Sequence, residues 1–347
     1  MDLIVVGLGW AGLRHAQAIR AVASKEDVRL AAVVDPDREH RAGLLAELGE
    51  PAAYDTLGEA LAAHQGAAVV LATPHALHRA GAEEAAGAGR AVLVEKPIAP
   101  TLADADAMID ACGRAGVTLM VAESARYNLT SIRLAEVVAA GRLGQPLAGR
   151  LSFVGSGTQQ YGYPGRRAWL SRPELGGSGV WLLNGIHHVS LARMLLGEVS
   201  RITAHEVRSD ELDAPGVEAS VMALLRFDDG AAAHLTSSVE LRGFKRFRDV
   251  VIFGSAGTAW TDLRDPQRVS VHHKDADEPE VIDCREPDTG GAPAHFVRQM
   301  REFIDAVRCG RTPATSGPEE RATLAVIEAG YESMRSGATV VVDRRSD

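Results

Sequence analysis

The chain is poor in cysteine. Its three cysteines, Cys112, Cys284 and Cys309, lie far apart among 347 residues, and no CxxC pair occurs. This pattern excludes a disulfide framework and a zinc knuckle, and it is typical of idle thiols in a reducing compartment. Two other features are missing: an apolar run of about 18 residues, which a transmembrane helix needs, and the basic start and cleavage site of a signal peptide. We therefore expect a cytoplasmic protein with no membrane partner.

The chain also lacks an excess of positive charge. It has 37 lysines and arginines against 46 acidic residues, a formal net charge of -9 at pH 7, and no basic stripe. Nucleic acid is therefore not an expected partner. The hydrophobic share of 46% and the charged share of 24% are ordinary for a globular protein. The length suggests about two domains of roughly 150 residues each.

The first third of the chain alternates between strand-like and helical stretches. The strand-like runs are Leu3–Val6, Arg29–Val34, Ala67–Thr73, Ala91–Val94 and Val117–Ala122, separated by helical patterns such as Leu13–Ala23 and Leu102–Ala115. Alternation of this kind predicts an α/β domain with a doubly wound parallel sheet. We predict that residues 1–123 form an NAD(P)-binding Rossmann domain.

A glycine turn with the spacing G-x-G-x-x-G joins the first strand to the first helix. In this pattern Gly7 allows the tight turn, Gly9 lets the backbone approach a pyrophosphate, and Gly12 lets the helix pack against the strand. The free N–H groups at the start of the helix favour phosphate. The whole turn is therefore predicted to bind the cofactor: Gly7, Leu8, Gly9, Trp10, Ala11 and Gly12.

The end of the second strand bears on the choice between NAD and NADP. Asp35 follows that strand, where a carboxylate can accept a hydrogen bond from a ribose 2′-hydroxyl and disfavours a 2′-phosphate. Arg38 lies three residues further on, and its cation could serve a 2′-phosphate. We predict NAD as the cofactor, with NADP as the alternative.

Further candidate residues lie at the ends of three other predicted strands. They are Thr73 and Pro74 after the third, Glu95 and Lys96 after the fourth, and Glu123 after the fifth. Because the carboxyl ends of parallel strands meet at one edge of a sheet, these residues are expected to lie together where ligands bind in such folds. Lys96 is the positively charged residue among those expected at this edge of the sheet.

Residues 124–347 show a different pattern. Consecutive strand-like runs cover much of residues 199–272, and Asp228–Gly230 reads as a hairpin turn. They predict an α+β domain with a largely antiparallel open sheet, which would bind substrate and form oligomer contacts. A helix is predicted over about residues 180–196. Helical spacing would place Asn184 on one face with His187 and His188.

These motifs resemble those of the glucose–fructose oxidoreductase/inositol dehydrogenase/rhizopine catabolism (Gfo/Idh/MocA) family over nearly the whole chain. The matching stretches are the glycine turn, V34-D35-P36-D37, A72-T73-P74 with His78, E95-K96-P97, G185-I186-H187, G254-S255-A256-G257-T258 and F303-I304-D305-A306-V307. The resemblance implies binding of NAD or NADP. It also implies hydride transfer between nicotinamide and a hydroxyl or carbonyl group of a sugar, cyclitol or related small molecule.

The resemblance also implies roles for single residues. Lys96 would lie near the nicotinamide and the reacting oxygen, His187 would be the acid/base, and Glu95 would help to fix Lys96 and the cofactor ribose. Thr73, Pro74 and His78 would belong to the cofactor site as well. Many members carry an aspartate four residues before the histidine, but this chain has Leu183 there.

Further residues are candidates for substrate binding, and none is a candidate metal ligand. The substrate candidates are Arg126, Tyr127, Tyr161, Tyr163, Trp169, Asn184 and His188. Packing is an alternative role for Tyr127 and His188, and a tyrosine of the loop could replace the missing aspartate as an acid. His272 and His273 are adjacent on a predicted strand and point to opposite faces, which argues against a paired metal site.

The sequence is also compatible with two alternative functions. One is a dinucleotide-binding sensor or regulatory protein without turnover, since one fold hosts many functions. The other is a reductase of an imine or an unsaturated bond, for which an Asp–His pair is not needed. The expected partner is a polar small molecule such as a polyol or sugar. The family resemblance further implies a homodimer or homotetramer formed through the second sheet.

Overall fold

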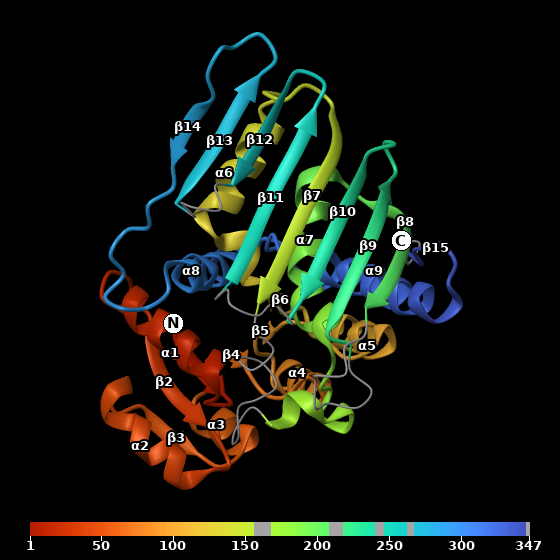
Figure 1. The fold of residues 1–347 in the computed structure, drawn as a ribbon. Helices are drawn as coiled ribbons and strands as arrows, with labels where there is room; N and C mark the ends of the chain where they lie inside the picture. The colour runs from red at the N-terminus through yellow and green to blue at the C-terminus, as the bar shows by residue number, and fades with distance from the viewer. Residues whose placement is uncertain (156–167, 208–217, 240–245, 262–266, 345–347) are drawn as a thin grey trace. The chain divides into compact units, whose positions relative to one another are not determined.

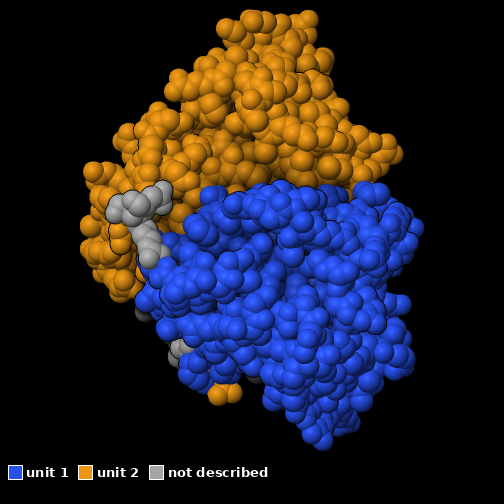
Figure 2. Space-filling model, turned by 180° about the vertical axis from the view of Figure 1, so that it is seen from behind, with its two compact units in different colours: residues 1–124, 174–176, 287–321 blue, residues 125–173, 177–286, 322–347 orange. Residues whose placement is uncertain are grey.

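The structure is a computed structural model that describes residues 1–155, 168–207, 218–239, 246–261 and 267–344. The chain divides into two compact units, which Figure 2 distinguishes by colour. Unit 1 contains residues 1–124, 174–176 and 287–321, and unit 2 contains residues 125–173, 177–286 and 322–347. The C-terminal third of the chain thus contributes to both units.

Unit 1 is built on a six-stranded parallel sheet (Figure 1). In sheet order its strands are β3 (Ala52–Tyr54), β2 (Arg29–Val34), β1 (Asp2–Val6), β4 (Ala68–Leu71), β5 (Val92–Glu95) and β6 (Leu119–Ala122). This strand order and the parallel pairing are those of a Rossmann fold, so the predicted fold of this part is confirmed. Apart from the edge strand β3, the strands are mostly buried, as expected of a sheet covered on both faces.

The α-helices of unit 1 begin either with or without a side-chain cap. They are α1 (Trp10–Ala23), α2 (Arg38–Leu48), α3 (Leu57–Ala63), α4 (His78–Gly87), α5 (Leu102–Ala115) and α8 (Ala294–Cys309). Thr56 and Glu59 form a capping box at the start of α3, and the Thr101 side chain accepts from the Asp104 N–H at the start of α5. Helix α8 packs against α1, where the ring of Phe296 lies 5.0 Å from that of His15.

Unit 2 is built on a nine-stranded sheet. In sheet order its strands are β14 (Glu280–Asp283), β13 (Arg268–His273), β12 (Gly257–Thr261), β11 (Arg246–Gly254), β7 (Pro146–Gly155), β10 (Ala232–Ser238), β9 (Ser220–Phe227), β8 (Val199–Val207) and β15 (Val340–Val341). Strands β7 and β10 run parallel, and every other neighbouring pair is antiparallel. The largely antiparallel sheet is therefore confirmed, as is the β9–β10 hairpin at residues 228–230.

Helices cover one face of this sheet. Helices α6 (Leu129–Ala139), α7 (Ile186–Leu196) and α9 (Gly317–Ser336) lie behind the sheet in Figure 1, whose other face is turned toward the viewer. Alternate residues of β9 are buried, whereas Met222 and Leu224 on the opposite side are each about half exposed. No helix in the described parts of the chain combines the length and apolar character needed to cross a membrane.

The helix predicted over residues 180–196 differs from expectation in its first turn. Residues Trp181–Gly185 form a π-helical turn (η6), and α7 begins only at Ile186. The Trp181 indole is fully buried, and Gly185 lies so close that a Cβ there would be 2.5 Å from a ring carbon. A π turn contains more residues than an α turn, so α-helical spacing does not hold within Trp181–Gly185, and the placement of Asn184 on one face with His187 and His188 stays a prediction.

Candidate functional site

The glycine turn between β1 and α1 is tightly packed at Gly7 and Gly12 and open at Gly9. Gly7 has a φ of 87°, and a Cβ there would lie 2.6 Å from the Ala72 carbonyl oxygen. A Cβ on Gly12 would lie 1.8 Å from the Gly7 carbonyl oxygen, so no side chain fits at either position. A Cβ on Gly9 would meet no atom within 4 Å. Among the three glycines of the turn, Gly9 is the one that has open space beside it in the described structure.

Two observations test whether a dinucleotide fits this turn. Helix α1 begins at Trp10 with no side-chain cap and no acidic residue in its first turn, so its N–H groups can donate to phosphate. The hydroxyl oxygen of Thr73, just beyond β4, is buried and makes no hydrogen bond with any residue that the structure describes. The helix N–H groups and the Thr73 hydroxyl are hydrogen-bond donors near the open space at Gly9. The residues present therefore fit the phosphates of a dinucleotide.

Asp35 is held rigidly at the carboxyl end of β2. Its Oδ2 accepts from the Leu8 N–H at 2.8 Å, and its Oδ1 accepts from the Asp37 N–H at 3.0 Å. The residue is almost fully buried. Both oxygens of this carboxylate thus accept backbone N–H groups, one of them in the glycine turn.

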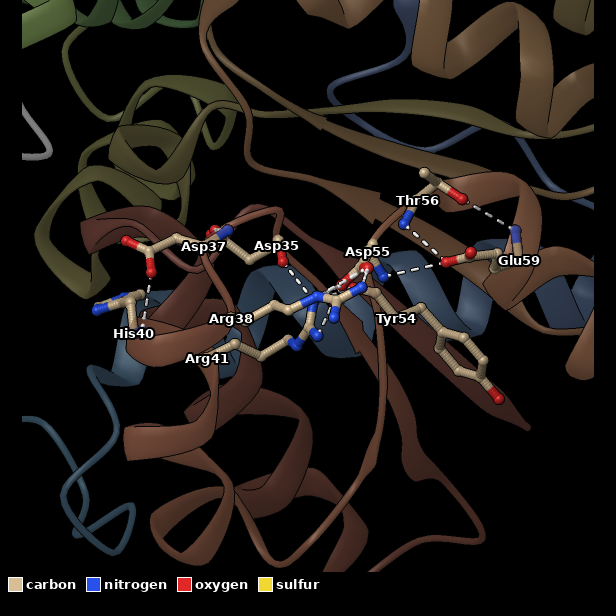
Figure 3. A network of polar contacts seen from close by, with 9 residues as sticks. All are labelled: Asp35, Asp37, Arg38, His40, Arg41, Tyr54, Asp55, Thr56 and Glu59. Carbon is tan, nitrogen blue, oxygen red and sulfur yellow. Dashed lines mark hydrogen bonds and ion pairs between the residues drawn. The ribbon is translucent and has the colours of Figure 1, made fainter.

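Arg38 belongs to a network of charges around Asp35 (Figure 3). Its Nε donates to both carboxylate oxygens of Asp55, at 3.1 and 3.0 Å, and its Nη2 donates to Oδ2. Arg41 donates from Nη2 to Oδ1 of the same carboxylate at 2.9 Å. The guanidinium groups of Arg38 and Arg41 lower the pKa of Asp55. Arg38 thus lies near the predicted ribose site but in an ion pair.

His15 is a member of the site that sequence reasoning missed. This residue of α1 is fully buried, and its Nε2 lies 2.8 Å from Oε1 of Glu95. The other oxygen of Glu95 accepts from the Lys96 N–H at 3.1 Å. The available signal was a histidine three residues beyond Gly12, on the helix that follows the glycine turn.

Lys96 follows β5 between two carboxylates. Burial lowers the pKa of Lys96, and the charges of Glu95 and Glu123 partly offset this effect. Glu123 is itself fully buried at the end of β6. The Lys96–Pro97 peptide bond is cis. The predicted strand ends therefore do bring a lysine and two acids together at one edge of the sheet.

Two buried histidines support the loop after β4. The nitrogens of the His78 ring face the backbone carbonyls of Thr73, Pro97 and Ile98, at 3.1 to 3.3 Å. Burial lowers the pKa of His78 and holds that of His75 well below its usual range. His78 thus connects the loops that carry Thr73 and Lys96, and its contact with a cofactor stays a prediction.

The candidate residues of unit 2 gather around helix α7. His187 is half-buried and His188 is buried, and both line a cavity of about 160 Å³. Polar groups share the lining of this cavity, among them Asn128, Thr130, Ser131 and Thr261. Asn184 is buried in the π turn, and its amide nitrogen makes no hydrogen bond with the residues described.

The other predicted substrate residues have varied environments. Arg126 is buried on the short 3₁₀ turn Ser124–Tyr127, and its Nε donates to the Ser190 hydroxyl at 2.7 Å. Tyr127 is buried beside it, which agrees with a packing role. Leu183 is buried and supplies no carboxylate. Trp169 is half-buried, whereas Tyr161 and Tyr163 lie outside the described residues. Among the described residues, no group of three or more His, Cys, Asp or Glu is placed to hold a metal ion.

Known proteins of one family match both halves of the chain. The family described as "Oxidoreductase family, NAD-binding Rossmann fold" matches residues 1–123, and the GFO/IDH/MocA C-terminal domain matches residues 132–260. D-apiose dehydrogenase of Paraburkholderia graminis is 31% identical over 346 residues, which cover 97% of this chain and 88% of that protein. The chain therefore belongs to the Gfo/Idh/MocA family of NAD-binding oxidoreductases.

Two further comparisons agree with this assignment. D-xylose 1-dehydrogenase (NADP(+)) 2 of Haloferax volcanii is 30% identical over 339 residues, covering 97% of this chain and 98% of that protein. The solved structure of levoglucosan dehydrogenase in complex with NADH and levoglucosan has the same fold, with a TM-score of 0.89. It shares 20% sequence identity and covers 99% of this chain and 100% of that one.

Proposed function

We propose that the protein is an NAD-dependent dehydrogenase that acts on a CH–OH group of a sugar, cyclitol or related small molecule. The single observation that carries this proposal is the position of Lys96, a partly buried lysine between Glu95 and Glu123 on the edge of the sheet that also bears the glycine turn. The names of the relatives support a sugar substrate, because D-apiose and D-xylose are pentoses and both relatives are dehydrogenases.

In this proposal the bound cofactor supplies a hydride acceptor, and the protein supplies charge and a proton path. The glycine turn, Thr73 and Asp35 hold the dinucleotide. Lys96 stabilises the negative charge that develops on the substrate oxygen, and its partial burial strengthens that interaction because water does not screen it. Glu95 fixes the backbone of Lys96 through the hydrogen bond to its N–H.

His187 carries the proton in the same proposal. A histidine changes charge near neutral pH, which suits exchange of a proton with an alcohol. Leu183 leaves His187 without the aspartate that many family members have, so Lys96 takes a larger share of the charge on the oxygen. The hydroxyl and amide groups in the cavity beside His187 suit a substrate rich in hydroxyl groups.

The test is a screen of the purified protein with NAD+ and a panel of pentoses, hexoses, polyols and cyclitols, followed through the absorbance of reduced nicotinamide. We expect turnover with at least one class of substrate. Lys96→Ala and His187→Gln should each lower kcat by about 100-fold or more. His272→Gln is the matched control, since His272 lies on β13 and bonds to the Ala276 carbonyl. Binding of NAD+ without turnover on any substrate would support a sensor instead.

We further propose that the protein is cytoplasmic and forms a homodimer or homotetramer through the open face of the nine-stranded sheet. The half-exposed Met222 and Leu224 support an interface there, because exposed apolar groups on a sheet face favour burial against a partner. Light scattering should report a dimer or tetramer, and the double substitution Met222→Glu and Leu224→Glu should lower the molar mass. A monomeric wild-type protein would contradict the interface.

A further inference from the structure

We propose that Asp55 is a specificity-determining residue that sets the preference for NAD over NADP by engaging Arg38 and Arg41. Two guanidinium groups lie beside Asp35 in the network of Figure 3, and a 2′-phosphate would need at least one of them. Both bind the carboxylate of Asp55 instead. This inference rests on the proposed placement of the adenosine ribose at Asp35.

The two arginines differ in how far they can move. Arg41 is largely buried, and its Nη1 donates to the carbonyl oxygens of Asp35 and Tyr54, so it joins the ends of β2 and β3. The Arg38 side chain is 78% exposed, and its guanidinium makes hydrogen bonds to Asp55 and to no other residue that the structure describes. Arg41 is therefore a fixed structural cation, and Arg38 is the one that a 2′-phosphate could recruit.

Asp55 is itself fixed by the helix that follows it. Its backbone N–H and that of Thr56 both donate to Oε2 of Glu59, at 3.1 and 3.2 Å. Glu59 and Thr56 form the capping box of α3. The carboxylate is thus presented to the arginines from a rigid position, which makes it an effective competitor for Arg38.

The local balance of charge also opposes a phosphate. The network contains four carboxylates, those of Asp35, Asp37, Asp55 and Glu59, against the two guanidinium groups. A phosphate monoester adds a charge of about -1.5 to -2. It would meet an excess of negative charge, whereas a 2′-hydroxyl is neutral and can donate to Asp35. Removal of the Asp55 charge reduces the excess of carboxylates over guanidinium groups from two to one and frees Arg38 at the same time.

The test uses Asp55→Asn, which keeps the shape of the side chain and removes its charge. Dissociation constants for NAD+ and NADP+ are measured by isothermal titration calorimetry at low ionic strength. We expect the dissociation constant of NADP+ to fall about tenfold, with a much smaller change for NAD+. Asp2→Asn is the matched control, because Asp2 pairs with Arg29 at the opposite end of β2. It should change neither constant.

Arg38→Ala in both backgrounds identifies the group that binds the phosphate. In the wild type this substitution should change NADP+ binding less than about twofold, and in the Asp55→Asn protein it should abolish the gain. An Asp55→Asn protein with an unchanged melting temperature and an unchanged ratio of the two constants would overturn the inference. The proposed function would still stand, because it fails only if neither dinucleotide binds or no substrate turns over.

A measurement on the wild type keeps the inference testable if Asp55→Asn does not fold. The dissociation constants of 5′-AMP and 2′,5′-ADP are compared between about 0.02 and 0.5 M salt. The ratio of the dissociation constant of 2′,5′-ADP to that of 5′-AMP should fall as the salt concentration rises, because salt screens the repulsion between charges. Discrimination that does not depend on salt would show that charge does not set the preference.

Discussion

The imidazole Nε2 of His15 lies 2.8 Å from Oε1 of Glu95, although 80 positions separate the two residues in the chain. The contact joins α1, which begins at the glycine turn, to the end of β5, which carries Lys96. The ring of Phe296 from α8 packs edge-on against His15 at 5.0 Å. We therefore expect His15 to act as a positioning residue that sets the orientation of Glu95, which in turn accepts the hydrogen bond from the Lys96 N–H.

Removal of the His15 ring should impair catalysis more than cofactor binding. In His15→Leu the carboxylate of Glu95 loses a buried partner, and we expect kcat to fall about tenfold while the dissociation constant of NAD+ changes less than about threefold. His15→Gln, which retains a donor, should recover most of kcat. His64→Leu is the control, since His64 contacts Tyr54 elsewhere in unit 1. Equal losses of kcat in His15→Leu and His15→Gln would contradict the positioning role.

Gly9 and Gly12 should respond differently to the same small change. Gly12→Ala places a Cβ 1.8 Å from the Gly7 carbonyl oxygen, so we expect destabilisation by about 2–4 kcal/mol, seen in chemical denaturation. Gly9→Ala places its Cβ in open space with a backbone φ of -69°, which alanine tolerates. It should leave stability within about 0.5 kcal/mol and weaken NAD+ binding at least tenfold. Unchanged NAD+ binding in Gly9→Ala would show that the glycine turn is not part of the cofactor site.

The elements that position the site could be predicted because their patterns are local. The bounds of α5 were predicted as observed, and five strands of the parallel sheet were recognised from their apolar runs. Strand β3 has three residues, too few to show a pattern, and Asp55 follows it directly. The role of Asp55 therefore could not be inferred. His15 was missed for a different reason: its partner is distant in sequence, and a buried histidine on a helix is indistinguishable from a packing residue.

The π turn at Trp181–Gly185 shows the limit of helical periodicity. The sequence around His187 has the pattern of one continuous helix, whereas the Trp181 indole of the first turn packs closely against Gly185 and Gly330. Gly330 lies on α9, about 150 residues later, where a Cβ would lie 2.5 Å from Nε1 of the indole. Contacts of this kind are set by tertiary structure and leave no local signal.

Lys96→Met should lower activity and raise stability. Burial lowers the pKa of Lys96 from its ordinary value of 10.5, which means that folding disfavours its charged form. The stability that the neutral lysine would provide is present above pH 10.5 and is lost as the pH falls through the lowered pKa. At pH 7 the charged lysine therefore lowers the free energy of unfolding. Methionine has a similar length and carries no charge.

We expect Lys96→Met to raise the melting temperature at pH 7 by roughly 1–3 °C while turnover becomes undetectable. The same substitution at Lys274, at the end of strand β13, is the control and should leave both turnover and melting temperature nearly unchanged. A Lys96→Met protein that melts well below the wild type would show that the lysine supports the fold, and retained turnover would show that it does not act on the substrate.

Glu218 should make the stability of unit 2 depend on pH. Its Oε1 accepts from the Trp181 N–H at 3.0 Å and from the Tyr331 hydroxyl at 2.8 Å, so one carboxylate holds the π turn and α9. Burial raises the pKa of Glu218 above its ordinary value near 4.5, and the hydrogen bonds only partly offset this. For an acid whose pKa is raised on folding, the stabilisation is present below pH 4.5 and is lost as the pH rises through the raised pKa.

Glu218→Gln should therefore be more stable than the wild type at pH 8 and nearly equal to it at pH 4. The glutamine carbonyl can occupy the place of Oε1 and accept both hydrogen bonds, and the neutral amide has no charge to bury. Melting temperatures of both proteins between pH 4 and 8 measure the difference, which should grow above about pH 4.5 and then level off. Glu218→Leu is the second variant: it lacks the charge but also both hydrogen bonds, so it should be less stable than Glu218→Gln at every pH. A difference between wild type and Glu218→Gln that does not vary with pH would show that Glu218 keeps the same charge in the folded and unfolded states.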